Sequence, residues 1–198
     1  MKKYLLKTMT FLVLAVLLVF PPVSAKALDL NALPSVIGGG HMQDFGWESI
    51  SYNTVGGRDD SKRLEAIKLN TPGEFSNKYH INYKMYVPRF GGWLPWVSSD
   101  VQFDANNTNT YAGTTGQSAE AKGVQLEIRD NNGNLVTDRA VIIYRVKLNN
   151  GQWLDWVSTP SNYKNINYDG TWIDGDYYAG SIRSANYITA FQAKILIH

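Results

Sequence analysis

A seven-residue segment occurs twice in this chain. Trp93–Ser99 reads WLPWVSS and Trp153–Thr159 reads WLDWVST, so the two copies differ only at their third and seventh positions. A chain that places two bulky indole rings twice at the same spacing repeats either a structural unit or a binding surface. An internal repeat decides the whole architecture, and it therefore constrains this fold more than any other feature.

A wider alignment extends the repeat to three copies. Segments that begin at Gly56, Gly113 and Gly180 align without gaps, at offsets of 57 and 67 residues. Each segment contains a small residue followed by an apolar one, and these pairs are Ala66–Ile67, Gly123–Val124 and Ala190–Phe191. A tryptophan precedes each copy, at Trp47, Trp93 and Trp153. We interpret each unit as a tryptophan strand, a loop, a glycine-led turn and a closing strand.

Alternating apolar and polar residues predict strands over Ile81–Val87, Val124–Ile128 and Val141–Leu148. Asn132–Gly133 and Asn150–Gly151 are turn dipeptides. One unit cannot bury its own apolar face, so three units are expected to share one core. We therefore expect an all-β fold, a three-unit pseudo-threefold β-prism-like domain, with a β-trefoil as the alternative. The domain would span 28–198, with repeats at about 30–70, 79–128 and 139–197.

The N-terminus has the features of a secretory signal peptide. Lysines at positions 2, 3 and 7 precede an apolar run over 9–20, and Ala25 and Ala27 suit signal peptidase. The run is shorter than the roughly 20 residues that span a membrane. We expect a signal over 1–25, cleaved after Ala25 or Ala27, and a secreted, extracellular or cell-surface protein. An uncleaved anchor is the alternative.

The apparent basicity of the chain belongs to this signal. The whole chain has a net charge of +2, and removing three lysines leaves 16 basic and 17 acidic side chains, or −1. A near-neutral chain releases few counterions from a phosphate backbone, so we expect no nucleic-acid partner. The chain contains no cysteine, and its fold must therefore be closed by a hydrophobic core rather than by disulfides.

Several of these segments resemble a known family. They are similar to the clostridial hydrophobic tryptophan (ChW) repeat at Gly92–Trp93, Trp96–Ser98, Ala112–Ser118 and Leu126–Ile128, and at Arg63–Ile67 in the first copy. The resemblance covers most of the chain after the signal. It implies a secreted or cell-surface protein of a Gram-positive bacterium with a role in adhesion or ligand binding, and it does not specify a ligand.

The second and third units carry insertions that the plain repeat lacks. The tryptophan precedes the aligned glycine by 9, 20 and 27 residues in the three units. The third insertion, over 162–178, combines aromatic rings with Asn and Asp. Sugars bind to such a mixture, because their C–H faces stack on rings and their hydroxyls bond to amides and carboxylates. The alternative is an extra hairpin that covers a sheet edge.

The candidate ligand-binding residues follow from these two features. We expect the first tryptophan of each unit to fill the shared core. The second tryptophan, replaced by Ile50 in the first unit, is freer to form a platform. The candidate ligand-binding residues are Trp96, Trp156, Tyr163, Tyr168, Asp169, Trp172, Asp174, Asp176 and Tyr178.

Catalytic and metal motifs are weak. Glu65 and Glu127 do not form the flanking carboxylate pair that a glycosidase needs. The segment Asp130–Asn134 has Leu135 where a Ca²⁺ loop requires glycine, so we interpret it as a turn. The carboxylates of the third insertion are the alternative Ca²⁺ ligands. We expect no enzyme activity, no catalytic residues, no metal, no cofactor and no membrane insertion.

Carbohydrate binding is the function that these patterns favour. The expected protein is lectin-like or adhesive, and its partner is a glycan, a cell-wall polysaccharide or a surface protein. Tyr, Trp, Ser, Gly and Asn are also the residues that protein-binding loops use. A protein–protein adhesin, or a secreted inhibitor or toxin component without glycan binding, is therefore the alternative.

Overall fold

The computed structural model describes residues 33–162, 167–168, 171–172 and 177–197, and in these ranges the protein is built from β-strands. No α-helix occurs in the described ranges, which contain only short 3₁₀ turns. These turns are η2 (Gly73–Asn77), η3 (Pro88–Phe90) and η4 (Thr108–Thr110). The prediction of an all-β fold is confirmed.

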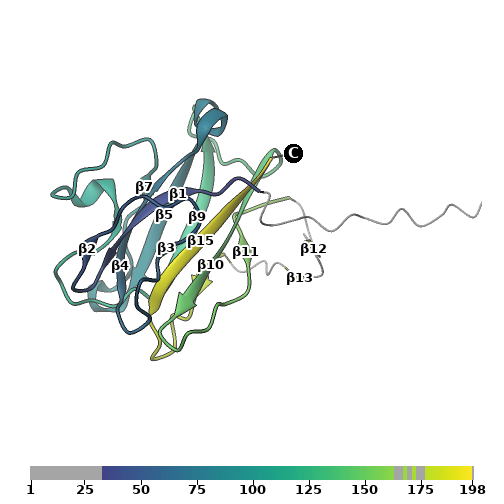
Figure 1. Ribbon diagram of the computed structural model, residues 1–198. Coiled ribbons are helices and arrows are strands. Elements are labelled where there is room, and N and C mark those ends of the chain that lie inside the picture. Colours follow the sequence, from purple (N-terminus) through teal and green to yellow (C-terminus); the bar gives the residue numbers. More distant parts are fainter. Residues whose placement is uncertain (1–32, 163–166, 169–170, 173–176, 198) are drawn as a thin grey trace, which may run out of the picture.

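Six long strands form three antiparallel pairs. The long axes of the three pairs are roughly aligned in Figure 1. The pairs are β1 (Ile37–Met42) with β4 (Leu64–Asn70), β5 (Tyr79–Val87) with β9 (Gly123–Asp130), and β10 (Ala140–Leu148) with β15 (Ile188–Ile197). We call β1–β4 the first unit, β5–β9 the second and β10–β15 the third. The strands predicted from alternation are confirmed as parts of β5, β9 and β10.

Short strands flank the first long strand of each unit. The tryptophan strands β2 (Gly46–Trp47) and β6 (Gly92–Trp93) pair with β1 and β5, and Trp153 bridges to Lys147 of β10. The second halves of the repeated segments, β7 (Val97–Ser98) and β11 (Val157–Ser158), pair with β5 and β10. A separate two-stranded pair joins β12 (Asn167–Tyr168) and β13 (Thr171–Trp172).

The glycine-led segments are strands rather than turns, and each pairs with a different unit. They are β3 (Val55–Gly56) on β15, β8 (Ala112–Gly113) on β4, and β14 (Ala179–Gly180) on β9. Each unit thus lends a short strand to the closing strand of another unit. The first unit gives its strand to the third, the second unit to the first, and the third unit to the second. The three sheets are therefore linked in a cycle, although each sheet itself is open.

The aligned residues of the repeat occupy equivalent rows across the three sheets. In the first sheet the row runs through Trp47, His41, Ala66 and Gly113. The other rows are Trp93, Tyr86, Gly123 and Gly180, and Trp153, Lys147, Ala190 and Gly56. The small third residue leaves room for the indole: a Cβ on Gly123 would lie 3.2 Å from the Trp93 ring.

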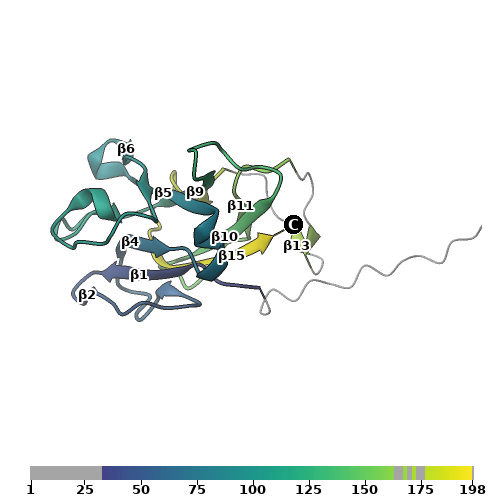
Figure 2. The same ribbon diagram turned by 90° about the horizontal axis from the view of Figure 1, so that it is seen from above.

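The inner faces of the three pairs share one hydrophobic core, and Figure 2 shows the pairs from above. Ile67, Val124 and Phe191, which follow the small residues of the rows, are all buried in it. The prediction that Trp47, Trp93 and Trp153 fill this core is wrong. They are only partly buried and lie outside the core cluster, because residues in one row share the outer face while their neighbours point inward.

Candidate functional site

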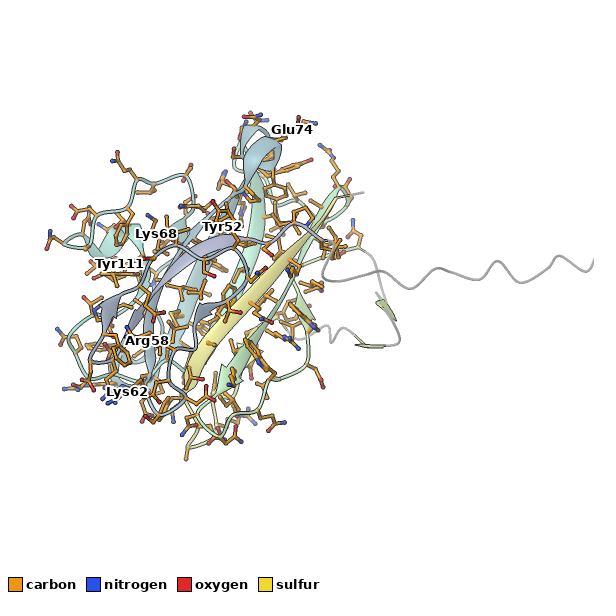
Figure 3. The ribbon with its side chains drawn as sticks, viewed as in Figure 1. Tyr52, Arg58, Lys62, Lys68, Glu74 and Tyr111 are labelled. Atoms are coloured by element: carbon orange, nitrogen blue, oxygen red, sulfur yellow. The ribbon has the colours of Figure 1, made fainter. Side chains whose placement is uncertain are left out.

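Aromatic residues from the insertions cover the tryptophans of neighbouring units. The Trp47 ring meets Phe103 edge-on at 4.8 Å and Tyr111 at 5.1 Å between centroids, and Figure 3 labels Tyr111 beside Lys68 on this face. Tyr178 meets Trp93 in the same way at 5.7 Å. Tyr111 and Tyr178 directly precede the exchanged strands β8 and β14, so the exchange carries each ring onto the adjacent sheet.

A cation lies over both rings of each WxxW segment. The Lys84 Nζ is 5.1 Å from the Trp93 centroid and 4.3 Å from that of Trp96. The Arg145 Cζ lies 4.7 and 4.5 Å from the centroids of Trp153 and Trp156. Because β1 and β5 align through His41 and Tyr86, the equivalent position in the first unit is Gly39, where no cation can stack. The second tryptophan is thus present where its cation is present, which is the pairing expected of a cation–π contact.

The two second tryptophans differ in exposure. Trp156 is 6% exposed and packs with Val141, Ile143 and Leu196, so its ring offers little surface to a ligand. Trp96 is 39% exposed. In the second sheet, the positions equivalent to Val141 and Leu196 are polar, because β5 and β9 carry His80 and Arg129 there. The second unit therefore leaves its second tryptophan open to solvent.

Trp96 stands on the rim of a pocket of about 240 Å³. The pocket is lined by Phe90, Leu94, Pro95, Trp96, Val97, Thr108, Asn109, Tyr111, Ala112, Gly113 and Thr114. We call it the aromatic pocket. Buried Val97, Tyr111 and Ala112 contribute to its wall, and exposed Phe90, Thr108 and Asn109 stand with Trp96 around it. Exposed rings beside amide and hydroxyl groups are what a small polar ligand with apolar faces requires.

The other predicted site residues are spread over different surroundings. Tyr163, Asp169, Asp174 and Asp176 lie outside the described residues. In the β12–β13 ribbon, the backbone of Tyr168 pairs with Thr171 and that of Trp172 pairs with Asn167. Tyr178 packs on Trp93, and Trp156 lies in its own buried cluster. Among the predicted residues whose side chains the structure describes, which are Trp96, Trp156 and Tyr178, Trp96 alone lines the aromatic pocket.

The pocket also uses residues that the sequence did not single out. Phe90 is 46% exposed and precedes Gly91–Gly92–Trp93, as Phe45 precedes Gly46–Trp47 in the first unit. This repeated Phe–Gly–Trp order was the available signal for Phe90. Asn109 had no such signal, because η4, which holds it, lies in the insertion of the second unit, and that insertion is not part of the aligned repeat. The Asn107 side chain caps η4 by accepting a hydrogen bond from the Asn109 N–H at 3.1 Å.

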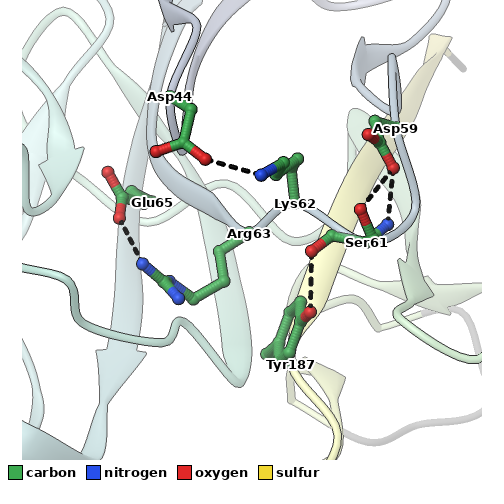
Figure 4. Close-up of polar contacts among 7 residues, drawn as sticks. All are labelled: Asp44, Asp59, Ser61, Lys62, Arg63, Glu65 and Tyr187. Carbon is green, nitrogen blue, oxygen red and sulfur yellow. Dashed lines mark hydrogen bonds and ion pairs between the residues drawn. The ribbon is translucent and has the colours of Figure 1, made fainter.

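The strand carboxylates are engaged in structural contacts. The Glu65 oxygens lie 3.2 Å from Arg63 Nη2 and 3.2 Å from His41 Nδ1. Glu127 accepts hydrogen bonds from Asn82 and Arg129. Figure 4 shows Arg63–Glu65 beside the Lys62–Asp44 pair, whose atoms are 2.6 Å apart. No group of three or more His, Asp or Glu side chains in the described ranges is placed to hold a metal ion.

The segment over 130–134 forms a turn, as predicted. Asp130 Oδ1 accepts hydrogen bonds from the N–H groups of Asn132 and Asn134, at 2.9 and 2.8 Å. The Asn134 side-chain amide also donates to this carboxylate and contributes most to lowering the pKa of the Asp130 carboxyl, and the two backbone N–H groups lower it further. Gly133 takes the left-handed conformation, with φ of 81°. The carboxylate therefore stabilises its own turn.

Comparisons with protein-family models, with curated proteins and with solved structures found no match to this chain. In the described ranges, no helix has the length and apolar character needed to cross a membrane.

Proposed function

We propose that this protein is a secreted or cell-surface carbohydrate-binding protein, and that it binds one sugar unit of its ligand in the aromatic pocket. The observation that carries the proposal is the pairing of two exposed rings, Trp96 and Phe90, with the exposed polar side chains of Thr108 and Asn109 around one hollow. The residues that line the aromatic pocket include no carboxylate or histidine that could act as a general acid or base. Binding without catalysis is therefore the proposed activity.

The chemistry of the pocket suits a sugar ring. The C–H face of a sugar stacks on an indole, and its hydroxyl groups exchange hydrogen bonds with an amide and a hydroxyl. Lys84 covers one face of the Trp96 ring and does not line the pocket, so the ligand would use the opposite face. The volume of about 240 Å³ lies below the roughly 300–1,000 Å³ of drug-sized sites, which suits a single ring better than a large ligand.

We propose a β-prism-like, pseudo-threefold arrangement for the domain, with the β-trefoil as the alternative. The cyclic exchange of β3, β8 and β14 supports it, as do the equivalent rows across three open sheets. Trp93, Gly113 and Ala66 of these rows belong to segments that resemble the ChW repeat. A secreted protein of that kind remains our proposal for the chain as a whole, on the basis of its signal-like N-terminus.

A glycan array tests the function, followed by titration calorimetry on the best ligand. We expect Trp96→Ala and Asn109→Ala each to weaken binding at least about tenfold, because each removes a principal contact with the sugar. Tyr52→Ala is the matched control: this tyrosine is 67% exposed and does not line the pocket, so its loss should leave sugar binding unchanged. Absence of glycan binding, or equal affinity in the Trp96 variant, would overturn the proposal.

Protein binding is the second candidate, and a different surface favours it. Phe45, Ile50 and Tyr52 are exposed large side chains in the loops of the first unit. Surfaces that bind other proteins often expose such side chains. Capture of a surface protein from a cell extract that is lost in Tyr52→Ala, and that is unaffected by competing sugar, would support this candidate.

A further inference from the structure

A second pocket lies beside the aromatic pocket. It has a volume of about 230 Å³ and is lined by Pro88, Arg89, Ser118, Ala119, Glu120 and Lys122. We call it the basic pocket. Two segments border both hollows: η3 gives Phe90 to one and Arg89 to the other, and the loop after β8 gives Thr114 to one and Ser118 to the other. A chain of linked sugar rings could therefore occupy both pockets at once.

The basic pocket carries excess positive charge. Its lining contains two cations, Arg89 and Lys122, and one carboxylate, Glu120. Glu120 pairs with Lys122 at 3.4 Å, and Lys122 also donates to the Ser184 carbonyl at 2.8 Å. Arg89 is exposed and makes no ion pair with any described residue. The excess positive charge of the basic pocket is therefore that of Arg89.

Arg89 is held in place without being neutralised. Its Nη1 donates to the backbone carbonyl of Gln117 at 2.6 Å, which fixes the guanidinium and leaves its other N–H groups to a ligand. The loop that supplies this carbonyl is itself anchored, because Ala119 and Ala121 are buried in the core. The Lys122 N–H also donates to the Tyr86 carbonyl at 2.9 Å. A pre-positioned guanidinium loses less conformational entropy when it binds an anion.

Several other cations of the molecule are neutralised by carboxylates. Lys62 and Arg63 are paired with Asp44 and Glu65, as Figure 4 shows. Lys147 is paired with Asp60 at 2.6 Å. The charge beside the aromatic pocket is thus distinct from the paired lysines and arginines in the β3–β4 loop and on β10.

From this arrangement we infer that the basic pocket is an anion-accepting subsite, and that the ligand is an acidic oligosaccharide. A neutral ring occupies the aromatic pocket, and the neighbouring sugar presents a carboxylate, as in a uronic or sialic acid, to Arg89. A planar guanidinium forms two parallel hydrogen bonds with a carboxylate, which favours this anion over a point-charge contact. The inference rests on the proposed sugar binding at Trp96.

Matched sugar pairs test the subsite. Calorimetry should compare lactose with sialyllactose and with sulfated lactose, and xylotetraose with its form branched by glucuronic acid. We expect the carboxylate form of at least one pair to bind about three- to tenfold more tightly, with the preference falling as salt rises. Arg89→Gln should remove the preference. Glu120→Gln should enlarge it, because it removes the competing carboxylate. Arg58→Gln removes an exposed arginine outside both pockets and should leave the preference intact.

The outcomes separate this inference from the proposed function. Equal affinity for the neutral and acidic forms, with both lost in Trp96→Ala, would overturn the subsite and leave sugar binding standing. A preference that survives Arg89→Gln would also overturn it. A stronger response to sulfate than to carboxylate would overturn the carboxylate assignment. If none of these sugars and no array glycan binds, the proposed function fails and this inference fails with it.

Discussion

Gly113 of the second unit pairs directly with Ala66 of the first, and a Cβ on Gly113 would lie 2.6 Å from the Ala66 Cα. It would also meet the Glu65 carbonyl oxygen. The Gly113 backbone has a φ of 108°, which side-chain-bearing residues rarely adopt. Gly180 makes the same approach to Gly123 between the third and second units. The repeated glycines are therefore needed because two backbones from different units come together at this point.

Substituting Gly113 tests this close approach. We expect Gly113→Ala to lower the free energy of unfolding by about 3 kcal/mol or more, because it adds a backbone clash to an unfavourable φ. Gly116→Ala is the matched control: it also has a positive φ, of 66°, but no atom lies within 4 Å of the new Cβ. It should cost only about 1 kcal/mol. Equal losses in urea unfolding would contradict the strand-exchange contact.

The last residue of each repeated segment has a specific role. Ser99 Oγ accepts a hydrogen bond from the Ile81 N–H at 2.9 Å, and Thr159 Oγ1 accepts one from the equivalent Ile142 N–H at 3.1 Å. Serine and threonine are thus interchangeable here because both supply a hydroxyl. This explains one of the two differences between WLPWVSS and WLDWVST.

Adjacent serines provide the test of this role. Ser99→Ala should cost about 1–3 kcal/mol of stability, because it leaves the buried Ile81 N–H without its acceptor. Ser98→Ala removes the neighbouring buried hydroxyl, which has no hydrogen-bond partner among the described residues, and should be neutral or slightly stabilising. Urea unfolding of both variants measures the difference. A larger loss for Ser98→Ala would show that the hydroxyl assignment is wrong.

The repeat predicted more about the strands than about their partners. Alternation identified three long strands, and the gap-free alignment at Gly56, Gly113 and Gly180 identified equivalent positions. It could not show that each glycine pairs with another unit, since pairing between distant segments leaves no local pattern. The first tryptophans were assigned to the core because bulky aromatic residues are usually buried. Trp47 instead shares the outer face with Ala66, whose small side chain was the available signal for a covered ring.

The lining of the aromatic pocket was predicted in part. Trp96 was identified, since a position occupied by Ile50 in the first unit is free to vary. Trp156 has the same sequence context but is covered, and only the identity of outer-face neighbours such as Val141 and Leu196 separates the two. Phe90 and Asn109 reach the aromatic pocket from a 3₁₀ turn and an insertion, whose positions depend on tertiary contacts.

The two stacked cations should contribute differently to stability. Arg145 stacks on the buried Trp156 ring and on the partly buried Trp153 ring, and its Nε donates to Gln192 Oε1 at 3.0 Å. Burial lowers the pKa of Arg145. Lys84 stacks on the more exposed Trp96. Arg145→Met should cost about 2 kcal/mol and Lys84→Met about 0.5–1 kcal/mol, because cation–π contacts strengthen when desolvated. Urea unfolding at low and high salt checks this. A neutral Arg145→Met, or a loss no larger than that of Lys84→Met, would contradict the structural role.

Alkaline pH should destabilise the fold through its buried tyrosines. Burial raises the pKa of Tyr83 from 10.0 to about 12, against the opposing hydrogen bond with the Leu69 backbone, and burial also raises that of Tyr144. Between pH 10 and about pH 12, Tyr83 has lost its phenolic proton in the unfolded chain but keeps it in the folded chain. Stability is therefore complete below about pH 10 and falls as pH rises toward 12. Tyr83→Phe should remove about 1–1.5 kcal/mol of this fall at pH 11, with Tyr52→Phe, at an exposed site, as the control. Urea unfolding from pH 8 to 11 measures the slopes, and identical slopes for wild type and Tyr83→Phe would refute the buried phenol.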